Sequence, residues 1–131
     1  MLFHSFKNQE ERRAFGGGDF VEFQTCRLKP GTSLREILSN PRLAHWEDDS
    51  LYVCGDDCAA FYAACGAIFT GGFYGNLESG PLDWCGLNYF TPEQSAVIVQ
   101  RLRLEQPPDC GLLLEWLEQG SGYNGFYVLG I

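Results

Sequence analysis

Basic residues are missing from the middle of this chain. No lysine or arginine occurs between Leu43 and Gln100, a section of 58 residues that contains eight of the 17 acidic side chains. The rest of the sequence holds nine acidic and nine basic residues, so the formal net charge of −8 belongs entirely to the middle section. Such a charge distribution disfavours nucleic acids and anionic membranes as partners and favours a basic protein.

Long apolar runs are missing as well. No stretch approaches the ~20 apolar residues that a membrane-spanning helix needs. The N-terminus has no basic segment followed by an apolar run, as a secretion signal would have, and we therefore expect a cytoplasmic protein. With 131 residues, of which 45% are hydrophobic and 15% aromatic, the chain is long enough to form one globular domain, 1–131, around its own core.

Spacings typical of metal sites are also lacking. Six cysteines are present, and in a reducing compartment the expectation is free thiols that pack as small hydrophobic side chains. Cys54 and Cys58 are four residues apart, but no second close pair or suitably spaced histidine completes a zinc site. The acidic pairs Asp48–Asp49 and Asp56–Asp57 lack the alternating ligands of a calcium loop. We predict neither a metal nor a cofactor.

The clearest local pattern is a helix start at Thr91-Pro92-Glu93-Gln94. The threonine hydroxyl can accept from a free backbone N–H, proline suits the first helical position, and Gln94 can complete a capping box. The helix is predicted from Pro92 to about Glu105, with Val97, Ile98 and Leu102 facing the core.

The other patterns indicate short strands and helices in alternation. The segment 19–29 alternates without a cleanly apolar face, which predicts a strand at a sheet edge. The segment 58–69 has a helical period and no charge on any side, which predicts a buried helix. Together these patterns predict a single α+β domain with a mostly antiparallel sheet and about four short helices packed against it. The remaining expected elements are a short N-terminal strand with a turn or brief helix within 1–18, helices at 34–39 and 110–119, and strands at 51–53, 84–90 and 123–131.

Candidate catalytic groups are weak. Cys85 could act as a nucleophile with His45 as base and Asp83 as orienting group, but no family pattern surrounds it and a buried thiol is the favoured interpretation. Cys58 stands at a helix N-terminus, which lowers a thiol pKa, whereas the neighbouring aspartates raise it. Glu78 and Asp83 could form a glycosidase pair, but nothing in the sequence sets the distance between them.

The more informative feature is the combination of aromatic and acidic residues in glycine-rich segments. Exposed tryptophan and tyrosine with charge at the rim are typical of protein interfaces. The residues that we predict to contact a partner are Glu47, Asp48, Asp49, Asp56, Asp57, Glu78, Asp83 and Trp84.

Three segments give the chain its general character: the acidic block from Glu47 to Asp57, the glycine and aromatic segment from Gly71 to Phe90, and the ending from Asn124 to Ile131. In this character the chain resembles bacterial immunity proteins, which neutralise the toxin domains of contact-dependent or type VI secretion systems. The resemblance implies a tight complex with a cognate toxin, often a basic enzyme, whose active site is blocked. It assigns no role to any single residue.

Two alternatives stay open. The first is a small enzyme or ligand-binding protein with a pocket lined by Cys58, Cys85, Tyr89 and His45. The second is a structural subunit, for which the interface would be larger and more apolar.

Overall fold

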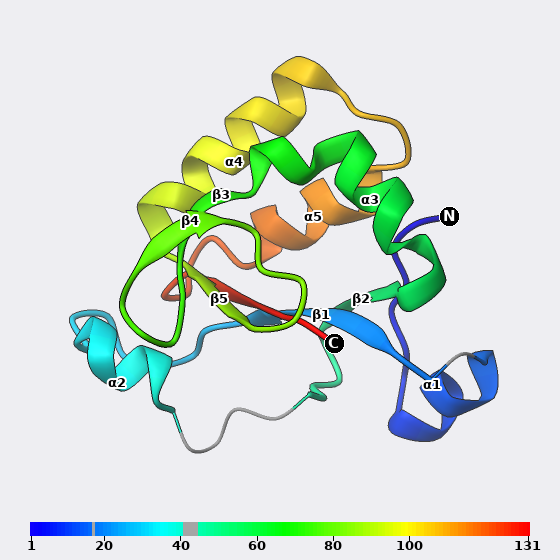
Figure 1. The fold of residues 1–131 in the computed structure, drawn as a ribbon, viewed down its shortest axis with the longest axis horizontal. Helices are drawn as coiled ribbons and strands as arrows, with labels where there is room; N and C mark the ends of the chain where they lie inside the picture. The colour runs from blue at the N-terminus through cyan, green and yellow to red at the C-terminus, as the bar shows by residue number, and fades with distance from the viewer. Residues whose placement is uncertain (17, 41–44) are drawn as a thin grey trace.

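The protein is an α+β domain built on one six-stranded sheet, as the sequence predicts (Figure 1). The computed structural model describes residues 1–16, 18–40 and 45–131. The strand order is β2-β1-β6-β5-β3-β4, and every described strand pair is antiparallel. The strands are β1 (Phe20–Thr25), β2 (Leu51–Cys54), β3 (Thr70–Phe73), β4 (Ser79–Pro81), β5 (Leu87–Phe90) and β6 (Phe126–Leu129).

Five α-helices and two 3₁₀ turns complete the described fold: α1 (Gln9–Phe15), α2 (Leu34–Leu38), η1 (Gly55–Asp57), α3 (Cys58–Cys65), η2 (Gly66–Ile68), α4 (Pro92–Glu105) and α5 (Gly111–Gln119). Helices α3, α4 and α5 lie on one side of the sheet, and α2 lies on the other side (Figure 1). None of the described helices combines the length and the apolar character needed to cross a membrane.

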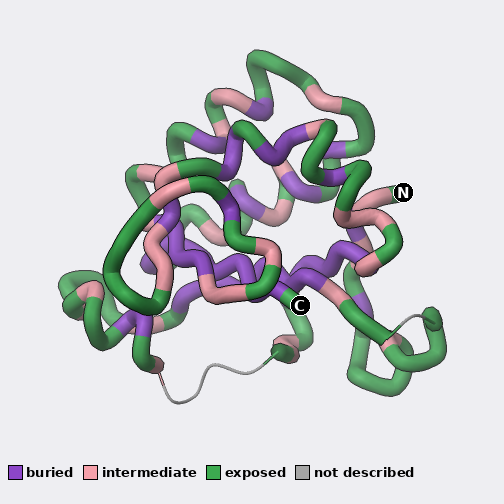
Figure 2. The backbone as a smooth tube through the Cα atoms, in the orientation of Figure 1, coloured by how far each residue is buried: buried purple, intermediate pink, exposed green. Residues whose placement is uncertain are grey.

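The larger core fills the space between the sheet and helices α3, α4 and α5. Its centre is a cluster of phenylalanine rings, in which Phe69 contacts Phe90 edge to face at 5.8 Å and Phe90 stacks on Phe126 at 5.0 Å. Such pairs add specific geometry to the burial of large apolar area. Strands β1, β2, β5 and β6 are buried along most of their length, whereas β3 and β4 are mostly intermediate or exposed (Figure 2).

A second, smaller core covers the opposite face of the sheet near α2. Tyr89 and Tyr127 are both about 1% exposed there, and their hydroxyl groups donate to the carbonyls of Asn124 (2.7 Å) and Ile37 (2.8 Å). Buried tyrosine hydroxyls need such partners because an unpaired polar group in a core is costly. The two cores explain why strands in the middle of this sheet have no solvent-facing side.

Strand β1 is therefore not at a sheet edge, contrary to the sequence-based expectation. It lies between β2 and β6, with Phe23 opposite Leu51 on one side and Val128 on the other. The polar residues Glu22 and Gln24 leave one face of the segment without a clean apolar pattern, which is why the sequence predicts an edge strand. Both are buried.

The predicted start of α4 is confirmed. The Thr91 hydroxyl accepts from the Gln94 backbone N–H at 3.1 Å, and the Gln94 side chain accepts from the Thr91 N–H at 2.9 Å. Gln94 also donates to the carbonyl of Gly71 at 2.7 Å, which links the helix to β3. Ile98 and Leu102 are buried as expected, but Val97 is 55% exposed, so its assignment to the core is wrong.

Helix α3 differs from the prediction in length and in burial. It ends at Cys65, and η2 leads into β3 at Thr70. Phe61 and Cys65 are buried, whereas the outer face is exposed, with Tyr62 at 51%. The absence of charge was read as burial on all sides, but only one face of this helix packs against the sheet. The exposed alanines of the outer face are Ala59, Ala60 and Ala63.

The strand predicted at 84–90 begins only at Leu87, because a turn held by Asn88 precedes it. The Asn88 side chain accepts from the Asp83 N–H and donates to the Asp83 carbonyl, both at 2.8 Å, and donates to the Val128 carbonyl at 3.0 Å. These bonds fix the turn that contains Trp84 against the centre of the sheet. At the N-terminus, the expected strand is reduced to a single bridge between His4 and Tyr52, followed by α1.

Candidate functional site

The eight predicted partner-binding residues form separate groups in the structure. Glu47, Asp48 and Asp49 precede β2 and lie together, with carboxylate oxygens within 4.8 Å of one another. Asp49 forms an ion pair with Arg27, and its backbone carbonyl accepts from the indole N–H of Trp116 at 2.8 Å. An exposed acidic cluster of this kind needs no metal ion to explain it, and one of its three charges is already paired.

The other acidic residues lie at a distance from this cluster. Asp56 and Asp57 follow β2, so the whole strand separates them from Asp49, about 13 Å for its four residues. Glu78 belongs to the turn between β3 and β4, and β4 and β2 are the two opposite edges of the sheet. Five strand spacings of about 4.8 Å separate these edges, or roughly 24 Å. The middle section of the chain thus does not present all its carboxylates on one face.

Three of the eight predicted residues, Asp56, Asp57 and Trp84, adjoin α3, and Asp83 directly precedes Trp84 in the chain. Trp84 packs edge to face on Phe61 at 5.5 Å and contacts the ring of Tyr62 at 5.5 Å. The Trp84 carbonyl accepts from the Ile131 N–H at 2.8 Å, and the side chain of Ile131 lies against Gly55 at the start of η1. We call this surface the Trp84 patch, and its residues are Asp56, Asp57, Tyr62, Asp83 and Trp84.

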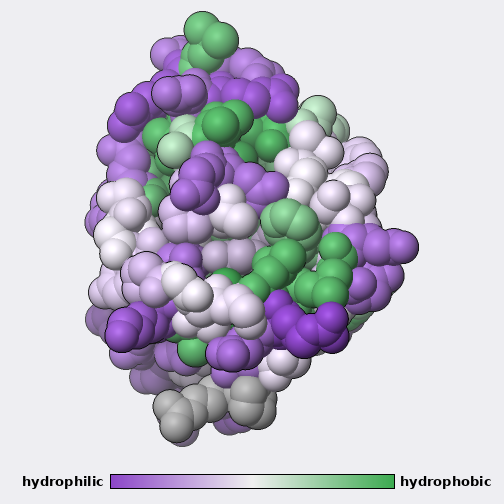
Figure 3. Space-filling model, turned by 90° about the vertical axis from the view of Figure 1, so that its left-hand side faces the viewer, coloured by the Kyte–Doolittle hydropathy of each residue, from purple (hydrophilic) through white to green (hydrophobic). Residues whose placement is uncertain are grey.

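Apolar side chains also reach the surface elsewhere. On the face shown in Figure 3 they gather in patches separated by polar side chains. The Trp84 patch differs because an entire helix beside it, Cys58–Cys65, carries no charged residue. The exposed face of this helix shares the depletion of charge that is found at interface centres, and Tyr62 and Trp84 add the aromatic residues that are enriched there.

The cysteine-lined pocket proposed from the sequence does not form. Tyr89 is buried in the core beside α2, on the face of the sheet opposite to α3 and Cys58. Cys58 is partly buried, and desolvation, followed by the nearby Cys54 and Asp57, raises the pKa of its thiol. That direction is opposite to the one a nucleophile requires. Cys85, expected to be buried, is exposed. Asp83 accepts from the Cys85 backbone N–H at 3.0 Å.

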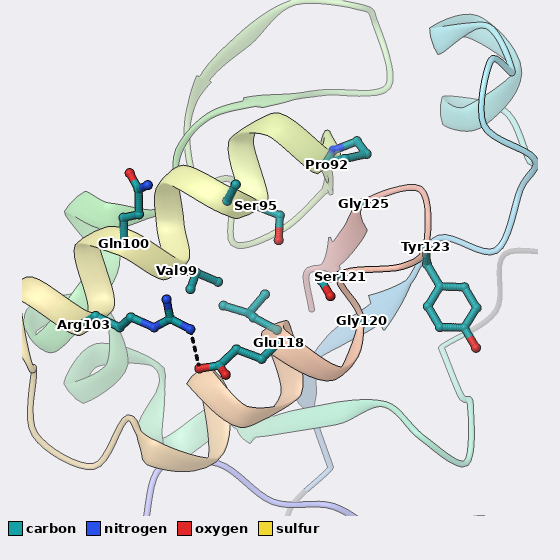
Figure 4. Close-up of a pocket in the computed structure, with 12 residues that line it drawn as sticks. Pro92, Ser95, Val99, Gln100, Arg103, Glu118, Gly120, Ser121, Tyr123 and Gly125 are labelled. Atoms are coloured by element: carbon teal, nitrogen blue, oxygen red, sulfur yellow. Dashed lines mark ion pairs between the residues drawn. The ribbon is translucent and has the colours of Figure 1, made fainter.

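A groove of about 450 Å³ lies between α4 and α5 (Figure 4). Ser95 and Val99 line it from α4, and an ion pair of 3.3 Å between Arg103 and Glu118 crosses between the two helices. Tyr123 points away from the space between the helices. The groove contains no buried charge and no pair of groups suited to acid–base or nucleophilic chemistry.

Sequence reasoning missed one functional candidate, the carboxyl group of Glu22 on β1. Glu22 is 1% exposed. Its Oε2 accepts from the Ser50 hydroxyl at 2.6 Å and from the Gln24 side chain at 2.9 Å, while its Oε1 has no hydrogen-bond partner among the described residues. Desolvation raises the pKa of this carboxyl, and the two hydrogen bonds and the charge of Arg12 offset only part of that rise.

Glu22 lines a cavity of about 380 Å³ between β1, α1 and the C-terminal residues. The other residues around this cavity include Arg12, Arg13, Asp19 and His45. The acidic residue at an alternating position of a strand was the available signal, but the alternation was interpreted only as that of an edge strand. A buried carboxyl in a cavity is a common property of binding and catalytic sites.

Comparisons with known proteins add no assignment: no family model, no curated protein and no solved structure matches this chain, so its function has to be inferred from the residues themselves.

Proposed function

We propose that this protein binds a basic protein and blocks its activity, as an immunity protein does with a bacterial toxin. The observation that carries this proposal is the Trp84 patch. Tyr62 is half exposed beside Trp84, on a helix without charged residues, and Asp56 and Asp57 immediately precede that helix. Aromatic anchors that are partly exposed in the free protein become fully buried when a partner covers them, and such residues contribute most to binding energy.

Charge supports the choice of a basic partner. The middle section contributes the full formal charge of −8. Of its acidic residues, Asp49 is the one that forms a described ion pair, with Arg27. Asp56, Asp57 and Asp83 form no described ion pair. Acidic residues around an interface increase the association rate with a basic protein and disfavour acidic competitors. A cytoplasmic location belongs to the same proposal, since a toxin has to be neutralised where it acts.

The Trp84 patch is the part of the predicted acidic surface that best suits this role. The cluster at Glu47–Asp49 lies at the other end of β2 and is partly neutralised by Arg27, and Glu78 lies near the far edge of the sheet. A stable interface covers about 800 Å² on each partner. An interface of that size centred on Trp84 would include η1 and the outer face of α3, and it would leave the α2 side of the molecule free.

The experiment starts from the neighbouring genes. We expect a gene beside this one to encode a large secreted protein with a short, basic C-terminal domain. Expression of that domain inside bacterial cells should stop growth, and co-expression of this protein should restore it. The double variant Tyr62→Ala/Trp84→Ala should lose the protection, whereas Tyr123→Ala, which removes a similarly exposed tyrosine outside the patch, should retain it. Failure of the unaltered protein to protect cells would contradict the proposal.

A further inference from the structure

The Glu22 cavity has the features of a binding site that is incomplete without a ligand. Glu22 Oε1 is buried and unpartnered among the described residues, and the residue lines the cavity. A buried polar atom without a partner costs about 1–3 kcal/mol, more when it is charged. Because Oε2 already accepts two hydrogen bonds, the unsatisfied capacity is confined to Oε1. A hydrogen-bond donor that enters through the cavity and displaces the groups that now cover Oε1 would remove this cost.

One wall of the same region already accommodates a guanidinium group. The Cζ atom of Arg12 lies 5.2 Å from the ring centres of Trp46 and Tyr52 and 5.8 Å from that of Phe20. Arg12 also donates to the carbonyl of His45 at 2.7 Å. Aromatic rings arranged around a cation bind it through their negative faces. Arg12 comes from α1, a short helix with no buried residue.

The charges around the cavity indicate which ligand is missing. Arg12 is held by the aromatic rings and the His45 carbonyl, and Arg13 donates to the Gln9 side chain at 3.3 Å. Both cations therefore have partners. Glu22 forms no ion pair among the described residues, and Asp19 supplies a second carboxylate at the rim. The unmet requirement is for a donor with positive charge and not for an anion.

We propose that the Glu22 cavity receives an arginine side chain of the partner protein, with the guanidinium donating to Glu22 Oε1 and to Asp19. A guanidinium has several donors in a planar fork, which suits two carboxylates better than an ammonium group does. The identity of the ligand as part of a protein depends on the proposed function, whereas the chemistry of the cavity does not. The cavity is thus a second contact point for a basic partner, separate from the Trp84 patch in its residues.

The test uses the purified protein and a small probe, N-acetyl-L-arginine amide, whose only charge is on the guanidinium. Titration followed by NMR should show saturable binding with a Kd on the order of 1 mM and shifts centred on Phe20 and Glu22. Glu22→Gln keeps the shape of the side chain and should weaken binding at least about tenfold. Glu115→Gln, which removes an exposed carboxylate of α5, should leave the Kd unchanged. Inorganic phosphate serves as the anionic probe.

A second variant gives opposite results for the two ligand classes. Arg12→Ala removes a competing cation from the cavity wall, so the arginine probe should bind several-fold more tightly. If the site were built for an anion, phosphate would bind saturably and Arg12→Ala would abolish that binding. This result, an unchanged Kd in Glu22→Gln, or no saturable binding of the arginine probe would each overturn the proposal. Because no partner protein is involved, loss of toxin protection by the Trp84 patch variants is measured independently.

Discussion

The ring of Tyr62 lies 5.5 Å from the ring of Trp84, although one residue is on a helix and the other is in the turn before β5. The ring of Trp84 packs edge to face on the buried ring of Phe61, and the Trp84 carbonyl accepts a hydrogen bond from the Ile131 N–H. Tyr62 is 51% exposed. The pair therefore joins a rigid anchor to an outer ring that is available to a partner.

Tyr62→Ala is expected to separate binding from stability. The half-exposed ring contributes little to the core, so the free energy of unfolding should fall by less than about 1 kcal/mol. Loss of an interface aromatic should weaken partner binding by about 2 kcal/mol, or roughly 30-fold in Kd. Urea denaturation and a binding titration with the toxin domain measure the two quantities. A stability loss as large as the binding loss would show that Tyr62 is a core residue instead.

Gly130→Ala is expected to displace the backbone of the turn that contains Trp84 and Gly86. A Cβ atom at Gly130 would overlap the carbonyl group of Trp84 and approach the N–H of Gly86 to 2.7 Å. Since the obstacle is backbone, relief requires movement of the turn, and we expect a loss of about 3 kcal/mol in the free energy of unfolding. Gly111→Ala is the matched control, because a Cβ there meets nothing within 4 Å and alanine favours the start of α5. Equal effects in the two variants would contradict the close approach.

Glu22 should make stability depend on pH. Burial raises the pKa of its carboxyl above the ordinary value of 4.5, so the folded protein binds this proton more tightly than the unfolded chain does. Its contribution to stability is then present below pH 4.5 and is lost as pH rises through the folded pKa. Glu22→Gln has no titrating group at this position, so its stability does not fall as pH rises through the folded pKa of Glu22. The stability of the variant relative to the unaltered protein should therefore increase between pH 5 and pH 8.

The size of that increase follows from linkage. Each pH unit by which the folded pKa exceeds the unfolded one corresponds to about 1.4 kcal/mol. Urea denaturation at the two pH values measures the difference, and Glu115→Gln controls for the loss of one carboxylate at the surface. Arg12, Glu47, Gln24 and Ser50 surround Glu22 and stay unchanged in the variant. The same stability difference at both pH values would show that Glu22 keeps its ordinary pKa.

The thiols offer a test of the enzyme alternative. Cys85 is exposed and should react first with a chromogenic disulfide reagent at neutral pH, at the rate of an ordinary surface thiol. Burial raises the pKa of Cys58, Cys65 and Cys110, so these should react more slowly. Cys85→Ser should remove the first reacting thiol. A fast reaction at Cys58 instead would favour the cysteine-dependent alternative.

Local sequence patterns predicted the parts of the fold that depend on neighbouring residues. The capping box at Thr91 and Gln94 was found because a side chain and a backbone N–H three residues apart decide it. The general class also followed, since short alternating elements with tight loops favour an antiparallel sheet with helices.

Two errors concern what lies on the second face of an element. Glu22 has a polar side chain in a strand with both faces covered, and α3 has an uncharged face with no covering layer. In both cases tertiary packing decides burial, and the periodicity of one segment contains no information about that packing. The separation of Asp56 from Asp49 follows from the length of β2, and the separation of Glu78 from both follows from the strand order. Glu22 is a polar residue in a buried place, and α3 presents an uncharged face to solvent. The Glu22 cavity and the Trp84 patch lie at these two positions.

The central claim is that the Trp84 patch binds a basic toxin domain with electrostatic assistance, and association kinetics test it most directly. The association rate of the double variant Asp56→Lys/Asp57→Lys should fall about tenfold or more at low salt, and the difference should shrink as added salt screens the charges. Glu36→Lys/Glu115→Lys makes the same charge change away from the patch and should have a much smaller effect. Equal association rates for the unaltered protein and the Asp56/Asp57 variant at low salt would contradict the account.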